Sequence, residues 1–176
     1  LKIAYIGGGS RGWAWTLMTD LEKANDLSGS VYLYDIDFEA AKNNEIIGNK
    51  INKDHWSFKA VKTIGEALTG ADFVVVSILP ATFDEMESDV HAPEKYKIYQ
   101  SVGDTTGPGG LFRALRTLPM MQEIAAAVRE FCPKAWVLNY TNPMAMLTGY
   151  MLRYTKVKTV GLCHSVQVCT RDLFRG

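Results

Sequence analysis

The feature that most restricts the fold is a cluster of glycines directly after a short apolar run. Gly7-Gly8-Gly9-Ser10-Arg11-Gly12 follows Ile3-Ala4-Tyr5-Ile6. Further on, Asp35 closes a second apolar run, Val31-Tyr32-Leu33-Tyr34. This order of strand, glycine turn, helix, strand and acidic residue is typical of a dinucleotide-binding βαβ unit. An ordinary glycine turn is the alternative, but the complete layout favours a nucleotide cofactor.

Each residue of the motif has an expected role. Gly7 allows the tight turn, Gly9 lets the backbone approach a pyrophosphate, and Gly12 lets the next helix pack close to the strand. Ser10 lies in the same turn and is expected to bind the cofactor together with these glycines. The Asp35 carboxylate would accept hydrogen bonds from both ribose hydroxyls and would repel a 2′-phosphate. The pattern therefore predicts NAD rather than NADP.

Composition excludes several classes of protein. The chain has 176 residues, with 19 basic and 19 acidic side chains that give a net charge of zero. A nucleic-acid-binding protein would show a basic excess. No apolar stretch approaches the roughly 20 residues that cross a membrane, and no export signal precedes the first strand. Three cysteines make no disulfide framework. A soluble protein of the reducing cytoplasm is expected.

The two ends of the chain are abrupt. Leu1 stands one residue before the first predicted strand, and the sequence stops at Leu173-Phe174-Arg175-Gly176 inside a predicted helix. We therefore expect a fragment of a longer polypeptide.

Strands and helices are expected to alternate in the order of a doubly wound α/β domain. The run at residues 73–78 is apolar on both faces, as a central parallel strand covered by helices should be. We expect one Rossmann domain over residues 1–176, with right-handed crossovers, similar to the N-terminal domain of lactate and malate dehydrogenases. The predicted strands are 2–6, 31–34, 58–61, 73–78, 136–139 and 159–162, and the predicted helices are 12–23, 38–50, 64–68, 111–131, one opening at Asn142-Pro143, and one at the end.

Two local expectations follow from the same pattern. The helix at 12–23 has apolar residues three or four apart, which places Trp13, Leu17, Leu21 and Ala24 on one face. Residues from Leu79 to about Gly110 carry three prolines and the glycine-rich segment 103–110, and they are expected to form a long loop. Because loops after a central strand face the ligand side of an open α/β sheet, this loop is expected to be functional.

Three groups of polar residues should meet at the carboxyl edge of the sheet. Asn139 and Asn142 follow one strand, where an amide can bind a substrate hydroxyl or only cap the next helix. Cys163 and His164 end the last strand, and they could bind a borderline metal ion, act as nucleophile and base, or simply be structural. The third group, Gly103-Asp104-Thr105-Thr106-Gly107-Pro108-Gly109-Gly110, implies a close backbone approach to something.

With these residues assembled, the chain resembles the N-terminal part of a family 4 glycoside hydrolase. The motifs that carry the resemblance are spread in order along nearly the whole chain. They are Ile3-Ala4-Tyr5-Ile6-Gly7-Gly8-Gly9-Ser10, Asp35-Ile36-Asp37, Gly103-Asp104-Thr105-Thr106-Gly107-Pro108-Gly109-Gly110, Asn139-Tyr140-Thr141-Asn142-Pro143 and Gly161-Leu162-Cys163-His164-Ser165. The Cys-His-Ser form is similar to the α-galactosidase and uronic-acid branch. The segment from Asp89 to Asp104 looks most like α-galacturonidases.

The resemblance implies an unusual mechanism for cleaving α-glycosidic bonds. The sugar is oxidised at C3 with NAD+ as hydride acceptor, the acidified C2 proton is removed, and the leaving group departs by elimination. Water then adds, and the hydride returns. Mn2+ holds the C2 and C3 oxygens as a Lewis acid. Matched by position, Cys163 resembles the metal ligand, His164 the proton donor and Asn142 the substrate-contacting asparagine.

Full-length members of this family are more than twice as long as this chain. The resemblance therefore places the second metal ligand, a histidine, and the general base beyond Gly176, with much of the sugar pocket. It also suggests a homo-oligomer, a dimer or tetramer. α-Galactosidase and α-glucuronidase are alternatives within the family. A lactate- or malate-type dehydrogenase and a purely NAD-binding domain are alternatives of other classes.

Overall fold

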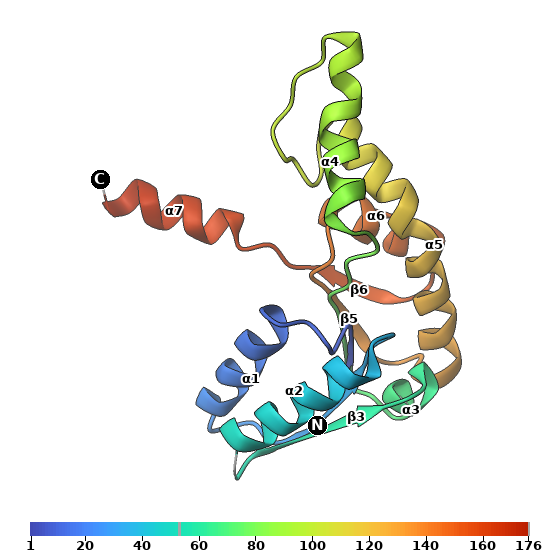
Figure 1. Cartoon of the computed structure of the whole chain (residues 1–176). Helices are drawn as coiled ribbons and strands as arrows, with labels where there is room; N and C mark the ends of the chain where they lie inside the picture. The colour runs from blue at the N-terminus through green and yellow to red at the C-terminus, as the bar shows by residue number, and fades with distance from the viewer. Residues whose placement is uncertain (53, 176) are drawn as a thin grey trace.

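The computed structural model describes residues 1–52 and 54–175. Its centre is a parallel sheet of six strands in the order β3-β2-β1-β4-β5-β6 (Figure 1). This is the strand order of a dinucleotide-binding fold, and it confirms the predicted doubly wound class. The strands are β1 (Lys2–Ile6), β2 (Gly29–Tyr34), β3 (Trp56–Val61), β4 (Phe73–Val76), β5 (Trp136–Asn139) and β6 (Lys158–Gly161).

Helices cover both faces of the sheet. The helices α1 (Trp13–Lys23) and α2 (Phe38–Ile51) lie on one face. On the other face lie α3 (Ile64–Leu68), α5 (Gly107–Phe131) and α6 (Met144–Tyr154). The chain thus changes face after β3, as the reversal of strand order between β1 and β4 requires.

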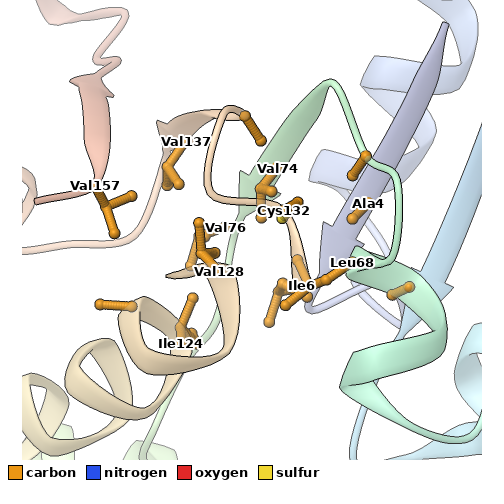
Figure 2. Packing of buried hydrophobic residues seen from close by; sticks show 14 of the residues in the cluster. Ala4, Ile6, Leu68, Val74, Val76, Ile124, Val128, Cys132, Val137 and Val157 are labelled. Atoms are coloured by element: carbon orange, nitrogen blue, oxygen red, sulfur yellow. The ribbon is translucent and has the colours of Figure 1, made fainter. Parts of the chain in front are cut away.

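The core consists of two apolar layers, one on each side of the sheet. Successive strand residues point to opposite faces, so β1 sends Ala4 and Ile6 to one layer and Ile3 and Tyr5 to the other. Figure 2 shows the first layer, where Ile6 lies with residues of β4, β5 and α5. Burial on both faces explains why the central strands are continuous apolar runs.

Short polar motifs start several helices where the sequence turns away from the sheet. The side chain of Asp37 accepts a hydrogen bond from the backbone N–H of Ala40 and caps α2. At α3, Thr63 and Glu66 form a capping box, in which each side chain bonds the other residue's backbone N–H. These caps explain why the predicted helix starts at 38 and 64 are correct.

The buried face of α1 differs from the predicted one. Trp13 remains 45% exposed, whereas Ala14, Met18 and Leu21 are buried. The spacing of three to four residues holds, but it starts one residue later. The reason is that Trp13 is the first helical residue, and it extends past the sheet edge to contact Tyr140 instead.

The expectation of a long irregular loop from 79 to 110 is wrong in large part. The segment contains α4 (Phe83–His91) and the 3-10 helix η1 (Ala92–Tyr96), and α5 begins at Gly107 rather than at 111. No residue of α4 is buried, and its apolar residues Phe83, Met86 and Val90, although three and four residues apart, are too few to distinguish a helix from a loop. Only the capping box of Thr82 with Glu85 marks its start.

The last helix, α7 (Ser165–Arg175), extends away from the sheet (Figure 1). Its residues Leu173 and Phe174 are 77% and 87% exposed. Within the described residues, no helix combines the length and apolar character needed to cross a bilayer.

Candidate functional site

The glycine turn follows β1 and lies beside the end of β4, where the order of strands in the sheet reverses. Gly7 has a φ of +91°, which glycine tolerates and other residues rarely adopt. A Cβ at this position would also collide with the backbone oxygen of Ser77. The N–H groups of Gly7 and Gly8 both donate to the carbonyl of Tyr34, each at 2.9 Å. The structure therefore supports the predicted role of Gly7 in a tight turn.

The other two glycines of the motif differ in their surroundings. A Cβ on Gly9 would lie 2.8 Å from the Cβ of Ala40, so this glycine is needed for packing within the protein. Gly12 has no atom within 4 Å of a hypothetical Cβ, so its predicted role in close helix packing is wrong. It precedes the first buried residue of α1, Ala14, and stands in the open at the N-cap position.

The N-terminus of α1 carries no side-chain cap and no acidic residue in its first turn. The first N–H groups of a helix lack partners inside the helix and attract anions. Ser10 is partly buried beside this end, and its N–H donates to the carbonyl of Gly7 at 3.1 Å. An open glycine turn leading into an uncapped helix fits the pyrophosphate of a dinucleotide.

Asp35 follows β2 and holds the glycine turn from the other side. One carboxylate oxygen accepts a hydrogen bond from the N–H of Gly9 at 2.8 Å, and the other accepts from the N–H of Asp37 at 3.0 Å. A carboxylate has about four lone-pair sites, so these bonds leave capacity for ribose hydroxyls. Asp35 therefore fits the predicted ribose role and also stabilises the turn.

Asn44, a residue that sequence reasoning missed, holds the backbone of the same turn. It is 3% exposed and lies on the face of α2 that packs on the sheet. Its Nδ2 donates to the carbonyls of Gly8 and Ser10 at 2.8 and 2.9 Å. Its Oδ1 accepts from the indole Nε1 of Trp15 at 2.8 Å. The available signal was an asparagine at an otherwise apolar helical position.

The two asparagines after β5 have separate roles. Asn139 is fully buried, and its amide bonds the N–H of Thr141 at 3.0 Å and the hydroxyl of Thr148 at 3.2 Å. These bonds hold the turn after β5 and do not cap α6, so the capping alternative for Asn139 is not supported. Asn142 is only partly buried, and its Nδ2 donates to Asp104 at 2.9 Å. The structure thus brings the glycine-rich segment 103–110 to the end of β5.

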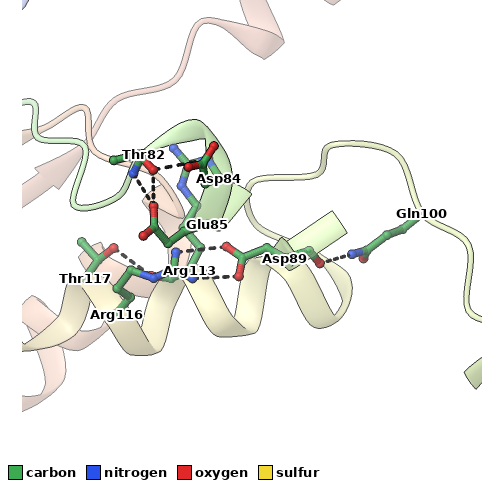
Figure 3. Close-up of polar contacts among 8 residues, drawn as sticks. All are labelled: Thr82, Asp84, Glu85, Asp89, Gln100, Arg113, Arg116 and Thr117. Atoms are coloured by element: carbon green, nitrogen blue, oxygen red, sulfur yellow. Dashed lines mark hydrogen bonds and ion pairs between the residues drawn. The ribbon is translucent and has the colours of Figure 1, made fainter. Parts of the chain in front are cut away.

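Residues 79–104 are fixed by contacts between α4, the following segment and α5. Arg116 of α5 pairs with both carboxylate oxygens of Asp89 on α4, at 2.7 and 3.0 Å (Figure 3). Gln100 donates from its amide to the Asp89 carbonyl at 2.8 Å, as the same view shows. Arg113, one turn before Arg116, pairs with Asp104. Two arginines of α5, each paired with an aspartate, therefore position residues 79–104.

Cys163 lies just past the end of β6 and is exposed. Its thiol contacts the hydroxyl of Ser165 at 3.2 Å. Hydrogen bonds from the side chain and then the backbone of Ser165 lower the pKa of the Cys163 thiol below its usual value of 9.0. The thiolate is the form that binds metal ions, so the site has the right chemistry for one metal ligand.

His164 is tied to the glycine-turn end of α1 by aromatic contacts. Its ring lies 5.8 Å from that of Trp13, which in turn lies 5.6 Å from Tyr140. Burial raises the pKa of the Tyr140 phenol, so this ring is neutral at physiological pH. The apolar spacing predicted a core position for Trp13, whereas in the structure its ring contacts those of Tyr140 and His164.

The described residues contain no group of three or more His, Cys, Asp or Glu side chains able to hold a metal ion. Cys163 therefore fits as one ligand of a metal site but does not make a site with its neighbours. His55 and His91 lie outside this region. Both are exposed, and His91 bonds Glu94 at 2.8 Å.

Sequence relatives cover almost the whole chain. An α-galacturonidase from Thermoanaerobacter italicus is 64% identical over 94% of this chain and 37% of its own length. An α-galactosidase from Bacillus subtilis is 41% identical over 99% of this chain and 41% of its own length. The chain thus spans about two-fifths of the curated relatives that it matches.

Solved structures agree with these relatives. The crystal structure of lplD from Bacillus subtilis has a TM-score of 0.93 at 52% identity, covering 98% of this chain and 40% of that one. A 6-phospho-beta-glucosidase from Thermotoga maritima, solved with manganese, NAD+ and glucose-6-phosphate, has a TM-score of 0.85 at 29% identity, covering 99% and 42%.

A lactate dehydrogenase from Eimeria maxima shares the fold, with a TM-score of 0.64 at 18% identity over 92% of this chain and 43% of its own. The family model described as Family 4 glycosyl hydrolase, in contrast, matches residues 2–176. Together with the relatives at 64% and 41% identity, this match covers every motif of the site. The chain belongs to the family 4 glycosyl hydrolases.

Proposed function

We propose that this chain is the NAD-binding part of an NAD- and Mn2+-dependent α-galacturonidase. The observation that carries the proposal is the meeting of three groups at one sheet edge. The uncapped glycine turn, the exposed Cys163 thiol and the partly buried Asn142 all follow parallel strands at their carboxyl ends. Ligands of open α/β sheets bind at this edge, beside the reversal of strand order.

The residues present fit NAD. Gly7 and Gly9 keep the turn free of side chains, and the N-terminus of α1 offers its N–H groups to the pyrophosphate. Asp35 has lone pairs left for the ribose hydroxyls. When bound, NAD+ supplies a reversible hydride acceptor for a sugar carbon. A carbonyl formed at C3 acidifies the neighbouring C2 proton, which makes elimination of the glycosidic oxygen feasible.

Cys163 would hold Mn2+ as one ligand through its thiolate. When bound, the metal supplies Lewis-acid polarisation of the sugar C2 and C3 oxygens. One thiolate does not retain a divalent ion, and the family resemblance implies a histidine as second ligand and a general base in sequence beyond Gly176. The chain is accordingly proposed as one domain, residues 1–176, of a longer enzyme.

Two further side chains would act on the sugar. His164 is proposed to donate a proton to the departing glycosidic oxygen, because it is exposed at the same edge and its ring is held against Trp13. Asn142 is proposed to bind a sugar hydroxyl through its amide. His164 lies in the short segment between β6 and α7, and its ring contact with Trp13 supports this role because it positions the ring beside the start of α1.

The choice of α-galacturonide rests on the relatives. The α-galacturonidases are 53–64% identical to this chain, whereas the α-galactosidase of Bacillus subtilis is 41% identical. We also propose a homo-oligomer in the cytoplasm. The exposed, low-pKa thiol of Cys163 supports a reducing compartment, since such a thiolate is readily oxidised.

The test is a substrate screen with the full-length protein. p-Nitrophenyl α-galacturonide, α-galactoside, α-glucuronide and α-glucoside are compared in the presence of NAD+, Mn2+ and a thiol. We expect the galacturonide to be cleaved with the highest kcat/KM, and a chelator to abolish the reaction. Preference for another of these sugars would correct the substrate, and cleavage that persists in the chelator would refute the metal role.

A further inference from the structure

We propose that Asp104 is a positioning residue that fixes the amide of Asn142 for substrate binding. This inference rests on the proposed function. Asp104 Oδ2 accepts a hydrogen bond from Asn142 Nδ2 at 2.9 Å, while Asp104 Oδ1 pairs with Arg113 of α5. The three side chains form a connected series, here called the relay, that runs from Arg113 on α5 through Asp104 to Asn142 after β5. The Arg113 side chain is 15% exposed and that of Asp104 36%, so the relay is partly shielded from water.

The partners of Asn142 allow only one orientation of its amide. On one side, a carboxylate can accept hydrogen bonds but cannot donate them, so it must face Nδ2. On the other side, the backbone N–H of Met144 can only donate, and it meets Oδ1 at 3.2 Å. Each end of the amide thus has one partner that excludes the flipped form. One N–H and one lone pair are left for a substrate hydroxyl.

The glycine-rich segment explains how Asp104 reaches Asn142. A Cβ on Gly110 would lie 2.5 Å from the backbone carbon of Thr105, so the segment presses directly on the first turn of α5. A Cβ on Gly109 would lie 3.2 Å from the carbonyl oxygen of Asp89. The close approach expected from these glycines is therefore to the protein's own backbone. This packing holds Asp104 beside Arg113, the seventh residue of α5.

A merely structural ion pair would affect folding but not the geometry of substrate binding. The relay differs because its last member is the residue proposed to contact the sugar. Displacement of a substrate-binding amide by about 1 Å can reduce catalysis about a hundredfold. Without Asp104, Nδ2 loses its acceptor and the amide can rotate. The loss should therefore appear in kcat/KM only while Asn142 is present.

The test is a double-mutant cycle in the full-length enzyme with p-nitrophenyl α-galacturonide. Asp104→Ala and Asn142→Ala are measured alone and together. We expect each single variant to lower kcat/KM by about ten- to a hundredfold. Asp104→Ala should cost less than about threefold once Asn142 is already alanine, because the two residues act as a unit. Additive losses would overturn the proposal.

Two variants guard against a trivial effect on folding. Asp104→Asn keeps the shape of the side chain but offers one acceptor oxygen to two donors, Asn142 and Arg113, so its kcat/KM should lie between those of Asp104→Ala and the wild type. Asn49→Ala removes two hydrogen bonds to Phe58 in the edge strand β3, which is far from β5 in the sheet, and it should lower the unfolding temperature with kcat/KM changed less than about threefold. A loss of kcat/KM in Asn49→Ala equal to that in Asp104→Ala would show general destabilisation and contradict the positioning role.

The same experiment distinguishes a failure of the proposed function from a failure of the proposed role of Asp104. If the wild-type enzyme cleaves none of the tested glycosides, the proposed function fails before the cycle begins. If it cleaves the galacturonide but Asp104→Ala retains full kcat/KM, the proposed function stands and the positioning role of Asp104 is refuted.

Discussion

At the scale of single residues, the site depends on how the protein tunes ordinary side chains. Hydrogen bonding by Ser165 lowers the pKa of the exposed Cys163 thiol and outweighs the smaller raising effect of burial. Asp35 has two roles: its carboxylate stabilises the glycine turn by hydrogen bonds, and it is the proposed partner of the ribose hydroxyls. The identities of these residues could be predicted from their positions after strands. Their second partners could not, because those bonds depend on tertiary placement.

The thiol of Cys163 should lose reactivity when its hydrogen-bond partner is removed. In Ser165→Ala the folded-state pKa of Cys163 should rise, so the thiolate forms only at higher pH. The pH profile of Cys163 alkylation by iodoacetamide, with sites identified by mass spectrometry, should shift to higher pH. An unchanged profile would show that Ser165 does not stabilise the thiolate.

Cys163→Ser should abolish glycoside turnover in the full-length enzyme while leaving NAD+ affinity within about twofold. A serine hydroxyl is a much poorer ligand for a borderline metal than a thiolate, and the hydrogen bond of the Cys163 thiol is to Ser165, outside the glycine turn. Turnover and calorimetric NAD+ binding are measured together. Retained turnover with Mn2+ would contradict the assignment of Cys163 as metal ligand.

Asp35→Ala should weaken NAD+ binding more than NADP+ binding. The carboxylate accepts hydrogen bonds from the ribose hydroxyls of NAD+ but repels the 2′-phosphate of NADP+. We expect the Kd for NAD+ to rise by about ten- to thirtyfold. The variant also loses the bond to the Gly9 N–H, so the ratio of the two affinities is the informative quantity. Equal losses for both cofactors would contradict the ribose role.

At the scale of elements, local sequence signals predicted those helices and strands that pack on the sheet. The helices α2 and α3 begin at Phe38 and Ile64, as expected. The exposed helix α4 was missed because it is short and has only three apolar residues, none of them buried. The role of Asn44 was missed because its three partners come from the turn and from α1, which no local pattern in α2 reveals.

Asn44→Ala should destabilise the protein and weaken NAD+ binding together. The carbonyls of Gly8 and Ser10 would lose their partner in a buried place, at a cost of about 2–3 kcal/mol in unfolding free energy. The turn would also lose the support that holds it open to the cofactor. Urea unfolding and NAD+ titration of the full-length protein measure both effects.

Asn49→Ala is the matched control on the same helix. Asn49 bonds the N–H and carbonyl of Phe58 in β3, each at 2.8 Å, away from the glycine turn. It should lower stability by a similar amount with NAD+ affinity unchanged. An equal loss of NAD+ affinity in both variants would show that general destabilisation, not support of the turn, is responsible.

At the scale of the whole molecule, the fold could be predicted because its determinants are local and repeated. Strands apolar on both faces alternate with amphipathic helices, and that alternation specifies a parallel sheet with helices on both sides. The glycine turn then marks the edge where ligands bind. The approach of Asp104 to Asn142 could not be predicted, since it joins residues from distant parts of the chain.

The central claim is that this sheet edge serves a hydrolase that works by reversible oxidation of the sugar. It is tested most directly by cleavage of p-nitrophenyl α-galacturonide by the full-length enzyme in D2O. The claim predicts a strict requirement for NAD+, no net accumulation of NADH, and deuterium at C2 of the released galacturonate, detected by NMR. Cleavage without NAD+, with only hydrogen at C2, would contradict it.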